Sequence, residues 1–506
     1  MDLLNNLAMG FHVAFSPMNF LFCLIGATIG TIVGILPGIG PVAAIAMLLP
    51  LTFKMPAIGA LIMLSGIYYG AHHAGATTAI MLNMPGEPSS VVICLDGYPM
   101  ARAGRAGPAL SIAAVGSFFA GCVSVVIIAT LSPLLAEASL QFGPAEYFST
   151  IVMALVMASV LSGDRFLTTL CMSVVGLLLG VVGTDLTTGD ARFNFGLMEL
   201  ADGVNFVAVA VGLFAFGEVI LHLGFPTKRA VITTKIKGLL PTRRDLGQSW
   251  KPILRGTTLG AILGIFPGTG PLLSSFASYA MERRLAKNPS RFGRGAIEGV
   301  AGPEAANNAA ALTHFIPMLT LGIPAGAAMA LMLGALQIQG ITPGPDVMNK
   351  NPELFWGVIA SMWIGNIMLL VLNLPMIGIW IRLLAIPFRY LYPAILAFCC
   401  IGAYSVNTSS FDIGLAALFG LAGIAFKMMD CSPAPLVLAL VLEPLLEENF
   451  RRQMILSSGD ATTFFTRPIS LAILLLTVGL AIYFSRRKTA AAGPEDGAAQ
   501  EAPQSS

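Results

Sequence analysis

Two short segments break an otherwise apolar sequence with the same cluster of glycine and proline. Residues 34–41 read GILPGIGP and residues 264–271 read GIFPGTGP. Proline removes a backbone donor and clashes with the preceding helical turn, and glycine loosens the helix that remains. Alignment of residues 26–41 with residues 256–271 gives ten identical positions of sixteen, at a constant offset of 230. This repetition predicts two copies of one unit, each with an interrupted helix.

The composition places these interruptions in a membrane protein. Only 11% of the 506 residues are charged and 56% are hydrophobic, whereas soluble domains carry about 25% charged residues. Several apolar runs approach the roughly 20 residues that a helix needs to cross a bilayer, namely 110–135, 146–163, 166–184, 203–223, 355–380, 411–426 and 468–484. We therefore expect an all-α polytopic membrane protein with about ten to thirteen transmembrane or half-spanning helices.

Positive charge predicts the orientation of the chain. Residues 225–255 carry eight Lys or Arg residues and one acid, Asp245, and Arg486, Arg487 and Lys488 follow the last apolar run. Because loops rich in Lys and Arg stay in the cytoplasm, we expect the central linker and the C-terminus there. Residues 1–53 contain no Lys or Arg, which favours an external N-terminus. Topology explains the basic linker better than nucleic-acid binding does.

These observations predict four parts of the chain. They are a first membrane repeat at 1–224, a basic cytoplasmic linker at 225–255, a second membrane repeat at 256–485 and a disordered cytoplasmic tail at 486–506. If the first copy starts outside and the second starts in the cytoplasm, the repeats have inverted topology. Interrupted helices at matching positions of inverted repeats are typical of secondary transporters, which bind substrate near the bilayer midplane.

The glycine–proline segments predict binding at exposed helix ends. A helix N-terminus attracts anions through unpaired N–H groups, and unwound carbonyls coordinate cations such as Na⁺. The candidates are Gly38 and Gly40 in the first copy and Gly268 and Gly270 in the second. The alternative is that these glycines only allow helices to pack closely.

A polar, helix-breaking patch follows in the first copy at residues 72–90, HHAGATTAIMLNMPGEPSS. Its candidate substrate-binding residues are Thr77, Thr78, Asn83, Pro85, Gly86 and Ser89. Glu87 is a candidate cation ligand or proton carrier, together with Asn83, because a carboxylate within a membrane is a functional hypothesis by default. Glu87 fits a hairpin tip at the water boundary equally well.

The second copy carries a matching patch at residues 302–328. Glu304, Asn307 and Asn308 have the i, i+3 and i+4 spacing of one helix face. Gly322 and Pro324 supply the break. We interpret the two asparagines, Gly322 and Pro324 as candidate substrate-binding residues and Glu304 as a cation-coupling residue. For the asparagines, hydrogen bonding between packed helices is the alternative.

Sequence patterns of enzymes and cofactor sites are missing from the chain. There is no phosphate-binding loop, no HExxH and no nucleophile elbow. His72 and His73 lack the neighbouring cysteines or carboxylates of a metal site, and the seven cysteines have no metal-ligand spacing. We therefore expect no enzyme activity, no cofactor, and no metal beyond a coupling Na⁺.

The long motifs resemble one family. GILPGIGP, YYGAHHAGATTAIMLNMPGEPSSVV with DGYPMARAGRAGPAL, and GIFPGTGP with GVAGPEAANNAAALTHFIPMLTLGIPAG together resemble the large membrane subunit of tripartite tricarboxylate transporters. The resemblance runs in order over residues 16–485. Two places depart from it: His72 and His73 stand where many relatives have small residues, and the second break lacks an acid that relatives often carry there.

The resemblance implies a bacterial inner-membrane permease of about twelve helices. Such proteins work with a small four-helix membrane subunit and a periplasmic solute-binding protein, which delivers an organic acid such as citrate. An Na⁺ or H⁺ gradient, and not ATP, drives uptake. By similarity to elevator-type carboxylate transporters, residues 83–90 and 322–326 would move together with the substrate. The alternatives are a transporter or channel that needs no binding protein, and an intramembrane enzyme.

Overall fold

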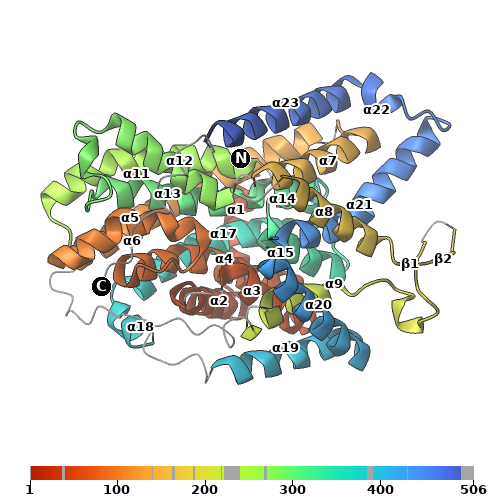
Figure 1. Cartoon of the computed structure of the whole chain (residues 1–506), viewed down its shortest axis with the longest axis horizontal. Helices are drawn as coiled ribbons and strands as arrows, with labels where there is room; N and C mark the ends of the chain where they lie inside the picture. The colour runs from red at the N-terminus through yellow and green to blue at the C-terminus, as the bar shows by residue number, and fades with distance from the viewer. Residues whose placement is uncertain are drawn as a thin grey trace, which may run out of the picture.

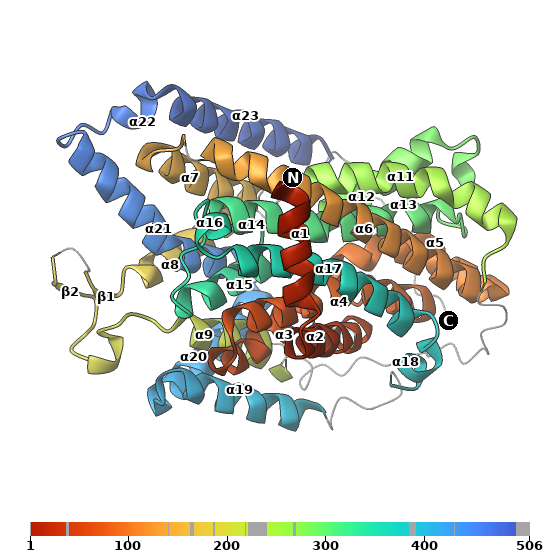
Figure 2. The ribbon, with the colours of Figure 1, turned by 180° about the vertical axis from the view of Figure 1, so that it is seen from behind.

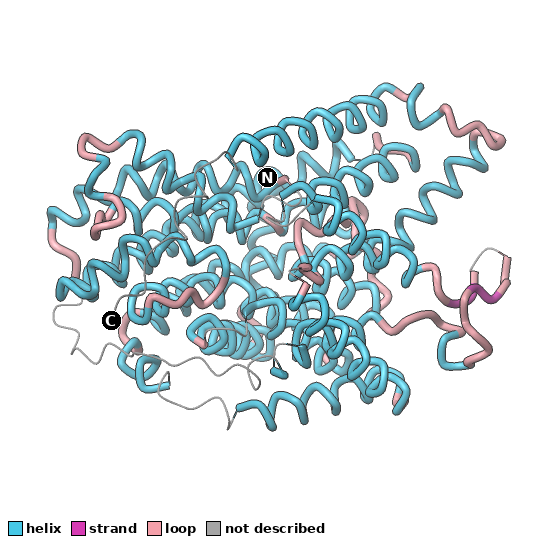
Figure 3. Tube along the Cα trace, in the orientation of Figure 1, coloured by secondary structure: helices cyan, strands magenta, loops and turns pink. Residues whose placement is uncertain are grey.

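The computed structural model describes residues 2–36, 40–139, 141–161, 166–185, 188–217, 219–220, 240–266, 270–383, 391–429 and 431–491. Most of this is helical, which confirms the expected all-α class (Figures 1 and 3). The α-helices are α1 (Asp2–Ala14), α2 (Pro17–Ile35), α3 (Gly40–Leu48), α4 (Ala57–Leu82), α5 (Val91–Met100), α6 (Ala106–Ser139), α7 (Pro144–Leu161), α8 (Phe166–Gly180), α9 (Phe206–Ala210), α11 (Arg243–Ile265), α12 (Gly270–Leu285), α13 (Glu298–Thr313), α14 (Phe315–Leu321), α15 (Ala327–Ile338), α16 (Val347–Lys350), α17 (Pro352–Asn373), α18 (Ile377–Leu383), α19 (Leu391–Asn407), α20 (Ser410–Met428), α21 (Ala434–Leu456), α22 (Thr463–Thr466) and α23 (Pro468–Ala491). Short 3₁₀ or π segments are η1 (Leu49–Lys54), η2 (Pro88–Ser90), η3 (Ala101–Arg105), η4 (Met198–Leu200), η5 (Val211–Phe216) and η6 (Pro289–Arg291).

Apolar helices of membrane-spanning character occur along the whole described chain. Four stretches are long and apolar enough to cross a bilayer, namely Pro17–Ile35, Pro88–Ser139, Pro352–Asn373 and Ser410–Met428. Six shorter apolar stretches accompany them, Gly40–Lys54, Pro144–Val160, Phe166–Gly180, Phe206–Phe216, Ala327–Ile338 and Pro468–Ile482. These apolar helices are those of a multi-pass membrane protein, and four stretches of the described chain are long enough to span a bilayer.

Both glycine–proline segments interrupt a helix, as predicted. In the first copy α2 ends at Ile35 and α3 begins at Gly40, and in the second α11 ends at Ile265 and α12 begins at Gly270. Gly40 and Gly270 have nearly equal φ angles, +56° and +58°, in the left-handed region that favours glycine. Residues 37–39 and 267–269 lie outside the described part, and the predicted site residues Gly38 and Gly268 are among them.

Glycines before each break allow two helices to approach closely. A methyl group on Gly30 of α2 would lie 2.5 Å from the Ile67 carbonyl oxygen of α4, and one on Gly260 of α11 would lie 2.7 Å from Ala306 Cα of α13. The same close approach recurs at Gly26 and Gly34 in the first copy and at Gly256 and Gly264 in the second. Close packing therefore explains the glycines upstream of each break.

A small β-hairpin, which the sequence analysis did not predict, projects from the helical body after α8 (Figures 1 and 2). Its strands β1 (Gly183–Thr184) and β2 (Ala191–Arg192) are antiparallel, with Gly183 opposite Arg192. The strands are two residues each, too short for a period-two pattern of apolar residues to mark them in a sequence.

Candidate functional site

The downstream breaks of the two copies have the same backbone geometry. Helix α4 ends before Asn83 and α14 ends before Gly322, and these residues are left-handed with φ of +55° and +70°. Glu87 and Gly326 are the extended residues that precede η2 and α15. Asn83 and Gly322 are separated by 239 positions, and so are Glu87 and Gly326. The two breaks therefore share a left-handed residue and an extended residue at the same spacing.

Each downstream break of one copy lies against the other copy. The helix α12, which follows the second glycine–proline segment, contacts η2 of the first copy. The helix α3, which follows the first glycine–proline segment, contacts α15 of the second copy. The backbone at Gly40, Gly270 and Gly326 faces open space, since a Cβ atom at any of the three would meet no described atom within 4 Å. Open backbone at these helix starts leaves room for a ligand.

Glu87 of the first break is buried and contacts the second copy. Its side chain is 1% exposed, and its Oε1 atom accepts a hydrogen bond from Asn307 Nδ2 at 3.0 Å. Ser89 Oγ also donates to Oε1, and His72 Nδ1 lies 2.5 Å from Oε2. The interpretation of Glu87 as a tip at the water boundary does not fit this burial.

The polar side chains predicted to share one face of α13 bind two different partners, Glu87 and Ser117. While Asn307 turns to Glu87, Glu304 Oε1 accepts hydrogen bonds from Asn308 Nδ2 and from Ser117 Oγ of α6, each at 3.0 Å. Ser117 Oγ also accepts from Asn308 Nδ2 at 2.8 Å. Two buried oxygens, Glu304 Oε2 and Asn307 Oδ1, accept no hydrogen bond within the described part of the chain. The face therefore both packs helices together and leaves acceptor capacity for a ligand.

The remaining predicted residues around the first break differ in their exposure. The side chain of Asn83 is exposed, whereas Thr77 and Thr78 are buried. Thr78 Oγ1 donates to the Gly75 carbonyl of its own helix at 3.1 Å. Gly86 packs tightly on α4, since a Cβ atom there would lie 2.9 Å from Gly75 Cα.

Two further predicted residues are prolines, and their exposure differs. Pro324 is buried at the second break, and Pro85 is half-buried at the first. A cavity of about 510 Å³ opens beside the second break, and Leu321, Gly322 and Ile323 line part of it. Its cations are each paired with an acid four positions earlier, Lys350 with Asp346 and Arg452 with Glu448. The second break is therefore accessible to a small molecule.

Sequence reasoning missed two polar partners of the carboxylates. The sequence marks His72 as a departure from the family pattern but does not pair it with Glu87, and Ser117 lies in the apolar helix α6 without a local signal. His72 also packs edge-on against Tyr68, with ring centroids 4.6 Å apart, and Tyr68 Oη lies 3.1 Å from His314 Nδ1. Among the described residues no group of three or more His, Cys, Asp or Glu side chains forms a metal site.

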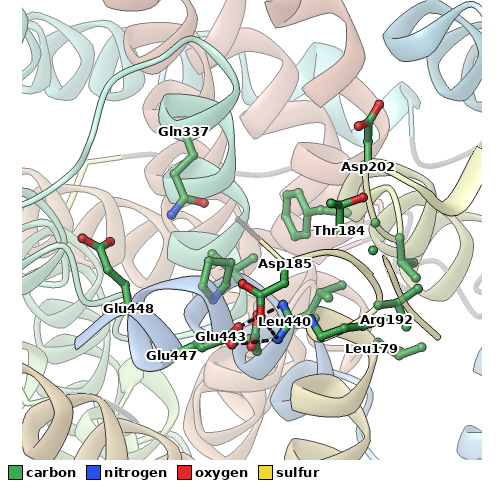
Figure 4. Close-up of a pocket in the computed structure, with 18 of the residues that line it drawn as sticks. Leu179, Thr184, Asp185, Arg192, Asp202, Gln337, Leu440, Glu443, Glu447 and Glu448 are labelled. Carbon is green, nitrogen blue, oxygen red and sulfur yellow. Dashed lines mark hydrogen bonds and ion pairs between the residues drawn. The ribbon is translucent and has the colours of Figure 1, made fainter. Parts of the chain in front are cut away.

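A larger cavity, of about 910 Å³, lies between α8, the β-hairpin, α15 and α21 and contains none of the predicted site residues (Figure 4). Arg192 donates to Glu447 at 2.7 Å (Figure 4), and Arg451 donates to Asp185 at 2.7 Å. Both arginines are thus already neutralised by acids, and Glu443 adds a further carboxyl group to the lining. This cavity is poorly suited to an organic acid.

Comparison with known proteins agrees with the motifs. The model of the tripartite tricarboxylate transporter TctA family matches residues 20–438. An uncharacterized 52.8 kDa protein in the TAR-I ttuC' 3' region of Agrobacterium vitis is 55% identical over 481 residues, which cover 95% of each chain. An uncharacterized protein in the TAR-II ttuC' 3' region of the same organism is 59% identical over 215 residues, 42% of this chain and 89% of that protein. No solved structure matches. The chain belongs to the tripartite tricarboxylate transporter TctA family.

Proposed function

We propose that this chain is the large permease subunit of a tripartite, binding-protein-dependent secondary transporter. It imports tricarboxylates or related organic acids with an Na⁺ or H⁺ gradient, and it carries no enzyme activity and no cofactor. Its partners are a small four-helix membrane subunit, a periplasmic solute-binding protein and the lipid bilayer of the bacterial inner membrane. The central linker and the C-terminus face the cytoplasm, and the two membrane repeats, 1–224 and 256–485, are inverted.

One observation carries this proposal. The helices of both copies are interrupted at corresponding positions, and the backbone at Gly40, Gly270 and Gly326 faces open space at the start of α3, α12 and α15. Helix N-termini favour carboxylates, and interrupted helices in paired repeats hold substrate in secondary transporters. The joint movement of both downstream breaks with the substrate is an analogy to elevator transporters.

The test is uptake into proteoliposomes that contain this chain and its small membrane partner, with the binding protein outside. Labelled citrate and several dicarboxylates are offered with an inward Na⁺ gradient, an inward H⁺ gradient or neither. Uptake that requires both a gradient and the binding protein supports the proposal. Uptake without the binding protein would instead identify a self-sufficient transporter, and equilibration without any gradient would identify a channel.

A further inference from the structure

We propose that His72 and Glu87 form a proton-binding pair that couples organic-acid movement to the movement of H⁺. The inference rests on the proposed transport function and names the coupling ion for this chain. His72 lies on α4 and Glu87 lies just beyond the end of the same helix, after the chain has turned back on it. The Nδ1 and Oε2 atoms are 2.5 Å apart, and the two side chains are 6% and 1% exposed.

Glu87 has no permanent cation beside it. Its Oε1 atom is occupied by two neutral donors, Asn307 Nδ2 and Ser89 Oγ, and its Oε2 atom faces only the His72 imidazole. Within the described residues, no Lys or Arg forms an ion pair with Glu87 or Glu304. Among the described side chains, only the His72 imidazole can bring a positive charge into contact with Glu87.

The described residues that interact with the pair include no Lys or Arg. On α4, Tyr68 packs against His72, and Glu304 on α13 interacts electrostatically with Glu87. His314, before α14, interacts with His72 and contacts Tyr68.

The buried acids on α5 and α12 have partners of their own. Asp96 of α5 accepts from Tyr279 of α12, and Glu282 of α12 binds Arg255 of α11. Helices α2 and α3 contribute no Asp, Glu, Lys or Arg at all. The further ionisable group on α13 that interacts with the pair's carboxylate is thus an acid, Glu304, and not a base.

The charge balance of the pair favours H⁺ over Na⁺ as the coupling ion. An unpaired carboxylate in a low-dielectric site costs several kcal/mol, so the pair is stable in a closed site when it holds one extra proton and is neutral overall. Opening to water removes this penalty and lets the proton leave. Loading adds one H⁺ from water to the pair, unloading returns one H⁺ to water on the other side, and no other bond changes. Na⁺ fits less well, because hard cations prefer oxygen ligands and Glu87 Oε2 faces a nitrogen.

The test compares Glu87→Gln and His72→Gln with wild type in proteoliposomes that contain the complete complex, a pH-sensitive dye and labelled citrate. With the membrane potential clamped and Na⁺ absent, an inward gradient of about one pH unit supports about tenfold accumulation per coupled proton. We expect this accumulation, with acidification of the lumen, in wild type. Both variants should lose it while the complex still assembles, as size-exclusion chromatography before reconstitution shows. His73→Gln is the matched control, a buried neighbouring histidine that should keep coupling.

Proton binding can also be measured independently of transport, from infrared difference spectra of the purified complex between acidic and alkaline buffer. We expect a protonation signal that both pair variants lose and His73→Gln retains. If this signal persists in the pair variants, or if Glu87→Gln still accumulates citrate from the proton gradient, the proton-binding pair is overturned. If wild type shows the signal but carries no organic acid under any gradient, the pair stands and the proposed transport function fails.

Discussion

The two copies share a packing scaffold but not their ionisable groups. Both have glycines that bring two helices together, and both end a helix in a left-handed residue, Asn83 or Gly322. At the offset of 239, however, Glu87 corresponds to Gly326 and Ser65 corresponds to Glu304. The first copy therefore carries its buried carboxylate on the break, and the second carries it on the helix before the break.

This difference makes the copies complementary. Glu87 on the first break accepts its hydrogen bond from Asn307 of the second copy, whose counterpart in the first copy is Tyr68. Tyr68 in turn contacts His314, which follows α13 of the second copy. The two copies thus have similar interrupted helices. The polar contacts between the copies are made by side chains that differ from one copy to the other.

The largest effect should come from filling the shared helix contact. Gly30→Leu and Gly260→Leu each force a side chain into the backbone of the facing helix, so each should destabilise the fold by at least about 3 kcal/mol. Thermal unfolding in detergent measures this, with Gly414→Leu on α20 as control because a Cβ atom there meets nothing within 4 Å. Normal stability of either contact variant would contradict equivalent packing in the two copies.

A second prediction concerns nine extra residues in the second copy. The two glycine–proline segments are 230 positions apart and the two downstream breaks are 239 apart, so the second copy is nine residues longer between them. They fall between α12 and α13, where Asp96 accepts from Gly295 N at 2.8 Å, Ala296 N at 2.7 Å and Tyr279 Oη at 2.9 Å. Asp96→Ala leaves these donors without an acceptor and should cost about 2–4 kcal/mol of stability. An unchanged unfolding temperature would show that the loop does not depend on Asp96.

Gly326→Leu tests the open backbone in the second copy. The φ angle of −176° suits any residue and nothing lies within 4 Å of the added Cβ atom, so the unfolding temperature should hardly change. If substrate occupies this space, uptake should fall about tenfold or more, equivalent to about 1.4 kcal/mol. Uptake at the wild-type rate would remove the start of α15 from the substrate site.

The smallest effects should come from exchanging the two left-handed residues. Asn83→Gly gives the first break the residue of the second, and stability should change by only a few tenths of a kcal/mol, since glycine adopts this conformation freely. Gly322→Ala should cost about 1–2 kcal/mol, because φ is +70° and the new Cβ atom would lie 2.7 Å from the Pro343 carbonyl oxygen. Equal unfolding temperatures for the two variants would contradict this asymmetry.

The sequence by itself determined the features that depend on neighbouring residues. Apolar runs specify membrane helices, and the interruptions between Ile35 and Gly40 and between Ile265 and Gly270 follow from glycine and proline chemistry within a few positions. The spacing of Glu304, Asn307 and Asn308 likewise fixes one helix face, since helical geometry is local.

Only the tertiary structure decided which polar groups meet. The contact of Asn307 with Glu87 spans 220 positions and that of Ser117 with Glu304 spans 187, so both depend on how distant helices pack. His72 reaches Glu87 because the chain folds back at Asn83, which turns two groups 15 positions apart toward each other. A hydrogen bond needs its two atoms within about 3 Å, and only packed helices set distances that closely.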